Sequence, residues 1–442
     1  MDEIQNYKCP CCGGVLVFSG AKQMLHCDSC GNDYEAETIK LATEADAQAQ
    51  TQSRYEWESY TPRSFSMDDI SLAAYECPSC GASIQGDNSL GATICPYCGN
   101  TTIIKDKFEG AYMPDYVLPF KLEKKDAMSG FRQSAARKMF IPKAFKSESK
   151  IKDVTGLYVP FWMFDCGAEA DITYSAQRVT SWSDGKYDYT KTDYFKLYRS
   201  GTAEFENIPV DASVKAEDAY MDAIEPFDYS AAVKFDSSYL SGYLADKYDV
   251  SVEDSIERAN RRIRSSMERM LKRDTNAYSA VETQDSSVRF SGGKVRYAFI
   301  PVWMLNVKYR DKMYKFVMNG QTGKSVGNYP VSKWKLTLLY AIVFAAALAI
   351  SIGVCDISNG LGLIISAVIA LVAAVLAGKS TQEVVTPADA DIYAKAGSAR
   401  ITRSQDIFLY DHVTRSERVK YNNRSPSMHT PPKGPMHGRG RL

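Results

Sequence analysis

Two sets of four cysteines have the spacing of metal ligands, and metal binding is the chemistry that this sequence offers most directly. Each set has the pattern Cys-x2-Cys-x14-Cys-x2-Cys, and every ligand of the second set follows its counterpart in the first at the same displacement. Such an internal repeat argues against chance clustering. A glycine follows the second cysteine of every pair, as a tight turn around a thiolate requires. The eight candidate ligands are Cys9, Cys12, Cys27, Cys30, Cys77, Cys80, Cys95 and Cys98.

Four thiolates in each set suit a tetrahedral Zn²⁺ ion with no open coordination position. We therefore predict two structural zinc sites, in zinc ribbons at 1–35 and 71–106, with a linker at 36–70. Disulfides and an iron–sulfur cluster stay open as alternatives. The acidic N-terminus lacks the pattern of a signal peptide, which favours the reducing cytosol, where disulfides are rare. Cys11 and His26 lie beside ligands, and we interpret both as bystanders.

The charge of the cysteine-rich region argues against nucleic-acid binding, which is a common function of zinc ribbons. Residues 1–105 carry six basic and fourteen acidic side chains, a net charge of about −8 that repels phosphate. The whole chain of 442 residues has 53 basic and 53 acidic side chains, so it provides no global attractive field. An acidic pair of ribbons is better suited to a protein partner.

Two apolar stretches near the C-terminus predict a transmembrane helical hairpin at 333–379. Its two spans, 336–354 and 358–378, contain no charged residue, and each is long enough to cross a bilayer. Lysines flank the outer ends but are absent from the turn, so the positive-inside rule predicts cytoplasmic termini and a cytoplasmic bulk of the chain. The absence of charge within the spans argues against a transport pathway. The alternative is a buried hairpin inside a soluble domain.

The middle of the chain carries a repeated motif. The segment Tyr158-Val-Pro-Phe-Trp-Met163 matches Phe299-Ile-Pro-Val-Trp-Met304 position by position. Each copy follows a helical pattern and precedes strand-like sequence. We therefore expect a multidomain protein in which two tandem α+β lobes with antiparallel sheets occupy 107–220 and 221–332. The tryptophan of each copy is expected to pack a helix on a sheet, with a ligand groove as the alternative.

The expected lobes contain no recognisable catalytic constellation. The chain has four histidines, none of them in these lobes, and no carboxylate pair is identifiable by spacing. We therefore expect the protein not to be an enzyme. Gly323-Lys324-Ser325 is similar to the end of a phosphate-binding loop, but the first glycine and the following helix of that motif are missing.

Two regions of the chain are rich in basic residues. The helix expected from Ser251 carries arginines on its outer faces, which we interpret as solvated, with an anionic lipid surface or an acidic partner as alternatives. Residues 380–442 are expected to form a basic, largely disordered cytosolic tail, because 400–442 carries nine basic and three acidic side chains and ends in sequence rich in Pro, Gly and Ser. This tail could contact an anionic lipid surface. A partner-docking motif within 401–419 is an alternative.

Taken together, the cysteine repeat, the repeated Pro-x-Trp motif, Asn319-Gly-Gln-Thr-Gly-Lys-Ser-Val326 and the apolar hairpin resemble a family of bacterial membrane-anchored double zinc-ribbon proteins. Its members carry a transcription-factor-IIB-type zinc-ribbon label or a primosomal helicase name, although this chain has no helicase motor motif. Some members are encoded beside proteins similar to phage-shock protein A and SPFH-domain membrane-stress proteins, and are thought to hold them at the membrane. The resemblance implies a recruitment platform whose site residues are the eight cysteines alone.

We therefore expect a non-enzymatic adaptor at the bacterial cell membrane, which recruits cytosolic or membrane proteins in a membrane-stress response. A membrane-tethered nucleic-acid-binding protein is the alternative. A third possibility is an accessory subunit of a membrane enzyme or transporter.

Overall fold

The computed structural model describes most of the chain and forms one large and two small β-sheets. The large sheet has twelve strands, and the small sheets have three and two. The described residues are 7–49, 53–61, 63–64, 72–87, 95–100, 104–106, 112–146, 154–310, 312–353, 359–382 and 389–417.

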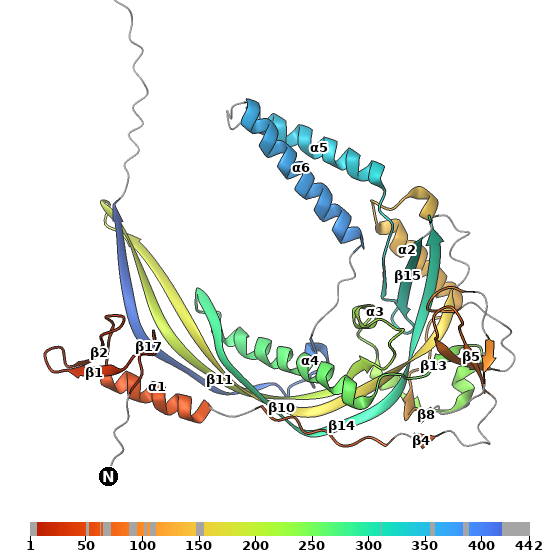
Figure 1. Cartoon of the computed structure of the whole chain (residues 1–442), viewed down its shortest axis with the longest axis horizontal. Helices are drawn as coiled ribbons and strands as arrows, with labels where there is room; N and C mark the ends of the chain where they lie inside the picture. Colours follow the sequence, from red (N-terminus) through yellow and green to blue (C-terminus); the bar gives the residue numbers. More distant parts are fainter. Residues whose placement is uncertain are drawn as a thin grey trace, which may run out of the picture.

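Four long antiparallel strands make a curved band that runs the length of the molecule (Figure 1). Their order across the band is β14, β10, β11 and β17. At about 3.3 Å per residue, the 29 residues of β10 follow a path of about 95 Å. The register shifts near Asp165 on both sides of β10, and such bulges bend a strand and increase its twist. The strands are β10 (Thr155–Ser183), β11 (Tyr187–Asp211), β14 (Ala280–Tyr309) and β17 (Arg400–Glu417).

The two copies of the repeated motif pair with each other inside this band. Tyr158 lies opposite Pro301, and Pro160 lies opposite Phe299, in the antiparallel ladder between β10 and β14. The expected lobes at 107–220 and 221–332 therefore share one sheet instead of each building its own. The physical reason is that each copy satisfies the backbone hydrogen bonds of the other, which a spacing pattern in sequence does not reveal.

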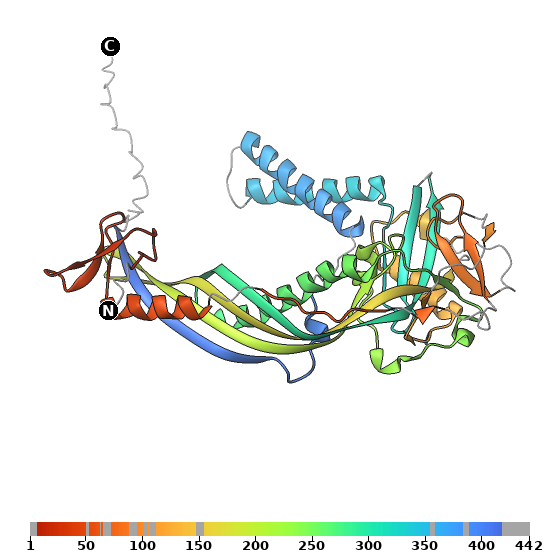
Figure 2. The same ribbon diagram turned by 60° about the horizontal axis from the view of Figure 1, so that its bottom comes forward.

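Helix α4 (Val252–Lys272) lies on the concave side of the band (Figures 1 and 2). It begins after Ser251, whose hydroxyl accepts a hydrogen bond from the amide of Asp254 at 3.2 Å. Ala259, Ile263 and Met267 are fully buried against the sheet. The helix expected from Ser251 is therefore confirmed, and its apolar stripe packs on the sheet.

Helix α2 (Lys124–Arg137) begins with a capping box, which Glu123 and Asp126 form. Phe131 and Ala135 pack with Trp303 and Phe316 in a separate cluster beside the band. The remaining short elements connect these parts: α3 (Asp218–Ala223), β4 (Arg63–Ser64), β8 (Tyr112–Met113), β9 (Tyr116–Val117), β12 (Val233–Lys234), β15 (Lys312–Asn319), β16 (Ser325–Gly327), η2 (Lys143–Lys146), η4 (Tyr229–Ala231), η5 (Ser237–Leu240) and η6 (Arg273–Thr275).

The two cysteine clusters lie at opposite ends of the band (Figure 1). The first belongs to the three-stranded sheet, which is followed by helix α1 (Ala36–Ala49). The second lies among three strands that join the large sheet through β13 (Leu244–Asp246). The strands are β1 (Leu16–Ser19), β2 (Met24–Cys27) and β3 (Asp33–Tyr34) for the first, and β5 (Leu72–Glu76), β6 (Ser83–Asp87) and β7 (Ile104–Asp106) for the second.

The expected linker at 36–70 is attached to the band along much of its described length. Helix α1 lies on β11, where the Tyr198 hydroxyl donates to Asp46 at 2.9 Å. The segment that follows runs beside β14, with bridges from Arg54 to Arg289 and from Trp57 to Gly293. It occupies the edge of β14, so these residues are a structural part of the sheet.

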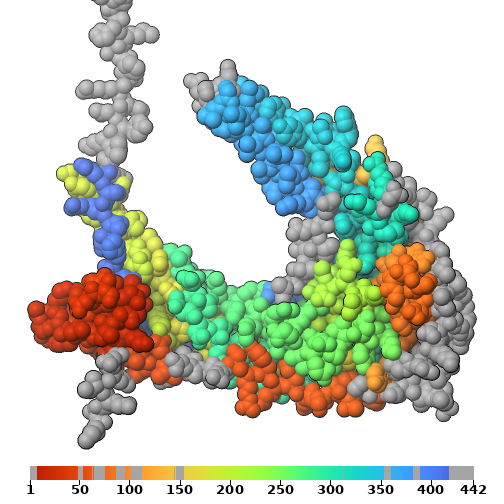
Figure 3. All heavy atoms as spheres, in the orientation of Figure 1, coloured from red at the N-terminus to blue at the C-terminus, as the bar shows by residue number. Residues whose placement is uncertain are grey.

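Two long apolar helices, α5 (Lys333–Gly353) and α6 (Asn359–Gln382), project from the rest of the molecule and pack against each other (Figure 3). The turn expected around Asp356 lies outside the described residues.

After α6 the chain returns to the band, which corrects the expectation of a largely disordered tail at 380–442. Residues 391–393 form the short helix η7 (Asp391–Tyr393), and β17 then pairs with β11 from Thr202 to Tyr187. Charged side chains are common on exposed edge strands, so the basic composition of this segment did not exclude a strand. The basic residues beyond 417 lie outside the described residues.

Candidate metal centres

The first four cysteines converge in space, as their spacing predicts. All four sulfurs lie within 4.8 Å of one another. The Sγ atoms of Cys9 and Cys30 are 3.6 Å apart, and those of Cys12 and Cys27 are 3.5 Å apart. Four sulfurs at about 2.3 Å from a tetrahedral ion would be separated by about 3.8 Å. The cluster therefore fits a four-coordinate metal, and its sulfurs are too far apart for a disulfide, whose bond is about 2 Å long.

The second cluster repeats this geometry. Its sulfurs also lie within 4.8 Å of one another, with 3.6 Å between Cys77 and Cys98 and 3.7 Å between Cys80 and Cys95. Every cysteine in the described part of the chain is free of disulfide bonds. Cys11 is exposed and belongs to neither cluster.

Glycine turns shape both clusters. In each of the four cysteine pairs, the amide of the glycine donates a hydrogen bond of 2.8 or 2.9 Å to the carbonyl of the first cysteine of the pair. All four glycines have positive φ between 68° and 77°, a conformation that other residues adopt only with strain. They are Gly13, Gly31, Gly81 and Gly99.

The same turns direct backbone amides toward the sulfurs. Burial alone would raise the pKa of the Cys27 thiol, but hydrogen bonds from the amides of Cys30 and Ser29 help to lower it to about 6. Burial likewise opposes ionisation of Cys77, whose pKa is nevertheless lowered to about 7 by amides of its own turn. Burial raises the pKa of Cys95. A cluster of four thiolates therefore needs a cation to balance its charge.

His26 does not join the first cluster. Its Nδ1 atom lies 2.6 Å from Asp33 Oδ1, and Asp33 also pairs with Lys22 at 2.7 Å. Tyr34 instead approaches the sulfurs, with its hydroxyl 3.2 Å from Cys9 Sγ. The imidazole is therefore held by a carboxylate on β3, which agrees with its interpretation as a bystander.

The two apolar helices are long and apolar enough to cross a membrane: Lys333–Ile352 and Gly360–Thr381 meet this criterion. Very little of either helix is covered by the rest of the molecule. Large side chains such as Ile342 and Ile364 are 59% and 63% exposed. A buried hairpin in a soluble core, the alternative considered above, would hide these side chains.

Three of the five arginines of α4, Arg258, Arg262 and Arg269, are paired with acidic residues of the same chain. Arg262 makes two hydrogen bonds to the carboxylate of Glu225, which is fully buried and also accepts a hydrogen bond from the Tyr393 hydroxyl at 2.7 Å. Arg258 pairs with Asp211 at 2.6 Å. The expectation of solvated arginines is therefore wrong for these residues, whose acidic partners belong to the same chain, whereas Arg261 is exposed as expected.

Sequence reasoning missed this network, although a signal for it exists. Ser255, Ala259, Arg262 and Ser266 follow one another at intervals of three or four residues and are all buried. Small residues on one face of a helix allow a neighbouring element to approach closely, and an arginine buried on such a face is almost always paired. Burial raises the pKa of Glu225, and this effect outweighs the opposing effect of its pairing with Arg262.

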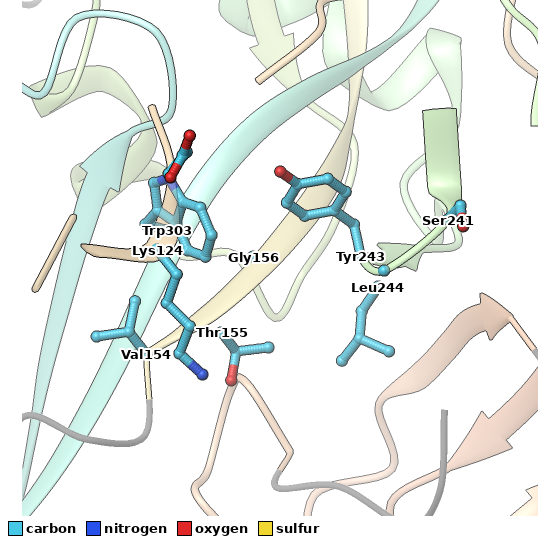
Figure 4. Close-up of a pocket in the computed structure, with 10 residues that line it drawn as sticks. Lys124, Val154, Thr155, Gly156, Ser241, Tyr243, Leu244 and Trp303 are labelled. Carbon is cyan, nitrogen blue, oxygen red and sulfur yellow. The ribbon is translucent and has the colours of Figure 1, made fainter. Parts of the chain in front are cut away.

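The repeated tryptophans have different surroundings. Trp162 is buried, and its Nε1 donates to the carbonyl of Val250 at 2.9 Å. Trp303 packs against α2 and also lines a cavity of about 460 Å³. Figure 4 shows Trp303 and Tyr243 on two sides of this cavity. The expected packing of a helix on the sheet is confirmed for Trp303, whereas Trp162 packs against the rings of Tyr248 and Tyr297. The ligand groove remains an alternative for Trp303 alone.

Comparison with known proteins identifies one relative of the chain. The chain is 33% identical over 338 residues to YdjG, an uncharacterized protein of Bacillus subtilis (strain 168), and the match covers 76% of this chain and 94% of YdjG. The chain belongs to the YdjG family. No model of a known protein family matches it, and no solved structure matches it. For this chain, the two four-cysteine clusters and the paired apolar helices are therefore the features from which a function can be argued.

Proposed function

We propose that this protein is a membrane-anchored, non-enzymatic adaptor that recruits cytosolic proteins to the inner face of the bacterial cell membrane. In this proposal α5 and α6 form a transmembrane hairpin. Each four-cysteine cluster holds a structural Zn²⁺ ion that stabilises its part of the cytosolic body. Proteins similar to phage-shock protein A or to SPFH-domain membrane proteins are the first candidate partners, because of the resemblance noted above.

The observation that carries the anchor is the path of the chain on either side of the hairpin. The chain enters α5 directly after β16, which belongs to the large sheet, and returns from α6 to β17, which belongs to the same sheet. Both outer ends of the hairpin are therefore attached to one folded body. A body of this size lies on one side of a bilayer, and the lysines at the outer ends favour the cytoplasmic side.

The proposed metal follows from the donor set. Four cysteine sulfurs at tetrahedral spacing suit Zn²⁺, which would neutralise part of the thiolate charge in each cluster. Such closed sites leave no coordination position for a substrate, so the metal would stabilise structure only. The acidic charge of 1–105 favours a protein partner over a nucleic acid.

Thiol labelling in intact cells tests the anchor. A reagent that cannot cross membranes should react with Cys355, which the proposed topology puts outside, and should leave the ribbon cysteines unlabelled until the membrane is opened. A Cys355→Ser variant is the control for the labelled position. Labelling of ribbon cysteines in intact cells would contradict the proposed orientation, and release of the full chain from membranes by carbonate would contradict the anchor itself.

Crosslinking capture from native membranes tests the adaptor. Wild type is compared with the Cys77→Ser/Cys80→Ser variant. Each sample is split into two halves, and one half is treated with nuclease. Protein partners that survive nuclease and are lost in the variant would support a zinc-dependent adaptor. A set of partners that depends on nucleic acid would favour the alternative of a membrane-tethered nucleic-acid-binding protein.

A further inference from the structure

A hollow of about 530 Å³ lies at the base of α5, where this helix leaves the folded body. One side is formed by the turn between β14 and β15, and the other by the first turn of α5. Three cations line it together with three aromatic side chains: Arg310, Lys312, Lys333, Tyr309, Tyr314 and Trp334.

The base of the hairpin is fixed relative to this hollow by hydrogen bonds. The Lys335 ammonium donates to the carbonyls of Met139 at 2.6 Å and Ile141 at 2.9 Å. The amide of Ser332 donates to the carbonyl of Phe140 at 2.8 Å. The residues that follow α2 therefore hold the start of α5 in place. Phe145 of the same segment contacts the rings of Tyr309 and Tyr314, so this segment links α5 to β14 and β15.

The three cations of the hollow have no acidic partner among the residues that the structure describes. No carboxylate of those residues forms an ion pair with Arg310, Lys312 or Lys333, whereas nearby Lys315 pairs with Glu217. The guanidinium of Arg310 lies 5.5 Å from the ring centre of Tyr309, which leaves its N–H donors free to bind an anion. In the sequence Asp311 stands between Arg310 and Lys312, and it lies outside the described residues.

An apolar stripe continues from the hollow along α5. Trp334, Leu338 and Ile342 follow one another at intervals of four residues, so they share a face of the helix. Their side chains are 76%, 51% and 59% exposed. A ligand with a phosphate in the hollow and a hydrocarbon chain on this stripe would match both surfaces.

We propose that the hollow binds the phosphodiester headgroup of an anionic phospholipid, whose acyl chains lie along Trp334, Leu338 and Ile342. This inference rests on the proposed insertion of α5 in the membrane, because only then does a lipid reach the hollow. Arginine and lysine bind phosphate through charge-assisted hydrogen bonds, and tryptophan at the end of a span occupies the headgroup region. A free phosphate would satisfy the cations but would leave the apolar stripe uncovered.

Lipid retention by the full chain tests the proposal. The protein is purified in detergent from a mixture of phosphatidylglycerol and phosphatidylcholine, and the bound phospholipids are counted by native mass spectrometry. Wild type should retain phosphatidylglycerol in preference to phosphatidylcholine. The Arg310→Gln/Lys312→Gln/Lys333→Gln variant should lose this preference. The ratio of bound phosphatidylglycerol to bound phosphatidylcholine should fall by about fivefold for each cation removed, before screening by salt.

A variant of matched charge separates a specific site from general attraction. Lys40, Lys186 and Lys272 are exposed and form no ion pair within the described part of the chain. Their triple replacement by Gln removes the same charge far from the hollow and should leave the preference intact. Equal losses in both triple variants, or no loss in either, would overturn the proposal.

A competition separates the lipid from a free phosphate. Glycerol 1-phosphate, which has the phosphate without acyl chains, should displace phosphatidylglycerol only at far higher concentration than a short-chain phosphatidylglycerol does. Displacement by both at equal concentration would overturn the lipid assignment. Carbonate extraction of the same variants tests anchoring independently, so a protein that stays in the membrane without lipid preference would refute this inference and leave the anchor standing.

Discussion

The two four-cysteine clusters share one ligand spacing but belong to different parts of the fold. The first has a small core of its own, in which Leu16, Leu25 and Ile39 surround the buried cysteines. The second contributes Cys77 and Cys95 to a large core that also contains Leu157 and Ile300 of the long strands. The spacing of the ligands fixes the geometry of each cluster, whereas the strands that pair beside it decide which core it stabilises.

The contacts of each cluster with its neighbours extend this contrast. Beside the second cluster, the Asn306 side chain of β14 donates to the carbonyl of Pro96 at 2.6 Å, and the Tyr97 hydroxyl donates to the buried carboxylate of Asp246. The first cluster meets the band through Tyr34, whose ring lies edge-on to Tyr410 at 5.8 Å, and through the attachment of α1 to β11. We therefore expect loss of the second metal to unfold the body, and loss of the first to have a local effect.

The largest expected effect comes from replacing the third ligand of each cluster. Cys27 and Cys95 occupy equivalent positions and are both fully buried, so Cys27→Ser and Cys95→Ser form a matched pair. Binding of structural zinc contributes an apparent ~10–16 kcal/mol to small domains. Cys95→Ser should therefore abolish the main cooperative unfolding transition of the full chain, and Cys27→Ser should leave that transition nearly unchanged.

Two measurements check this pair. Metal analysis should give two zinc ions per wild-type chain and one per chain in each variant. Tryptophan fluorescence should follow unfolding of the body, since Trp162 lies in its core. Identical unfolding curves of Cys27→Ser and Cys95→Ser would contradict the contrast between the clusters. A wild-type chain that is fully folded without metal would refute both zinc sites.

A smaller effect is expected from the buried pair of Arg262 and Glu225, which stabilises the body independently of either metal. Removing one partner of such a pair leaves an uncompensated buried charge and costs ~3–5 kcal/mol. Arg262→Gln should therefore lower the melting temperature of the body with both zinc ions still bound. Chemical denaturation of Arg262→Gln, Glu225→Gln and the double variant measures the coupling, and additive losses would show that the two residues do not act as a pair.

Sequence reasoning predicted local features well and long-range pairing poorly. The cysteine turns, the capped helix from Ser251 and the two apolar helices all depend on residues close together in the chain, and the structure contains each of them. The pairing of the two Pro-x-Trp copies joins strands that are far apart in the chain, and the pairing of β17 with β11 joins strands that are farther apart still. Neither the hydrophobic periodicity of a strand nor its composition indicates which distant strand it pairs with. Two lobes and a disordered tail were therefore expected in place of one shared sheet.

The same limit applies to charge. The arginines of α4 and the residues around Asp391 lie on opposite sides of the apolar helices in sequence, yet Arg269 pairs with Asp391 at 2.8 Å. An arginine-rich helix alone does not indicate whether its partner is water, lipid or another part of the chain. The return of the chain after α6 brings Asp391 to this helix.

Glycine replacements provide a finer test of the contrast between the clusters. Gly13 and Gly81 have φ values of 72° and 68°, and an added Cβ would meet no atom within 4 Å at either position. Alanine at either position therefore adds backbone strain of ~1–2 kcal/mol without a steric clash. Gly81→Ala should lower the stability of the body by this amount, whereas Gly13→Ala should leave it unchanged and should increase hydrogen exchange in 7–49. Equal shifts of the main transition would contradict the assignment of the first cluster to a separate core.

The smallest expected effect is at the contact that joins the first cluster to the band. Tyr410 lies edge-on to Tyr34 and stacks on Tyr194 at 4.4 Å, and such aromatic pairs contribute ~0.5–1.5 kcal/mol each. Tyr410→Leu removes both ring contacts but keeps an apolar side chain on β17. Hydrogen exchange should rise in the first cluster and in β17 while zinc content and the main transition stay the same. A matched Phe408→Leu variant, which removes a ring that contacts Phe195 and not the cluster, should leave exchange at 7–49 unchanged. If both variants raise that exchange equally, pairing of β17 with β11 holds the first cluster in place, and the tyrosine contact has no separate role.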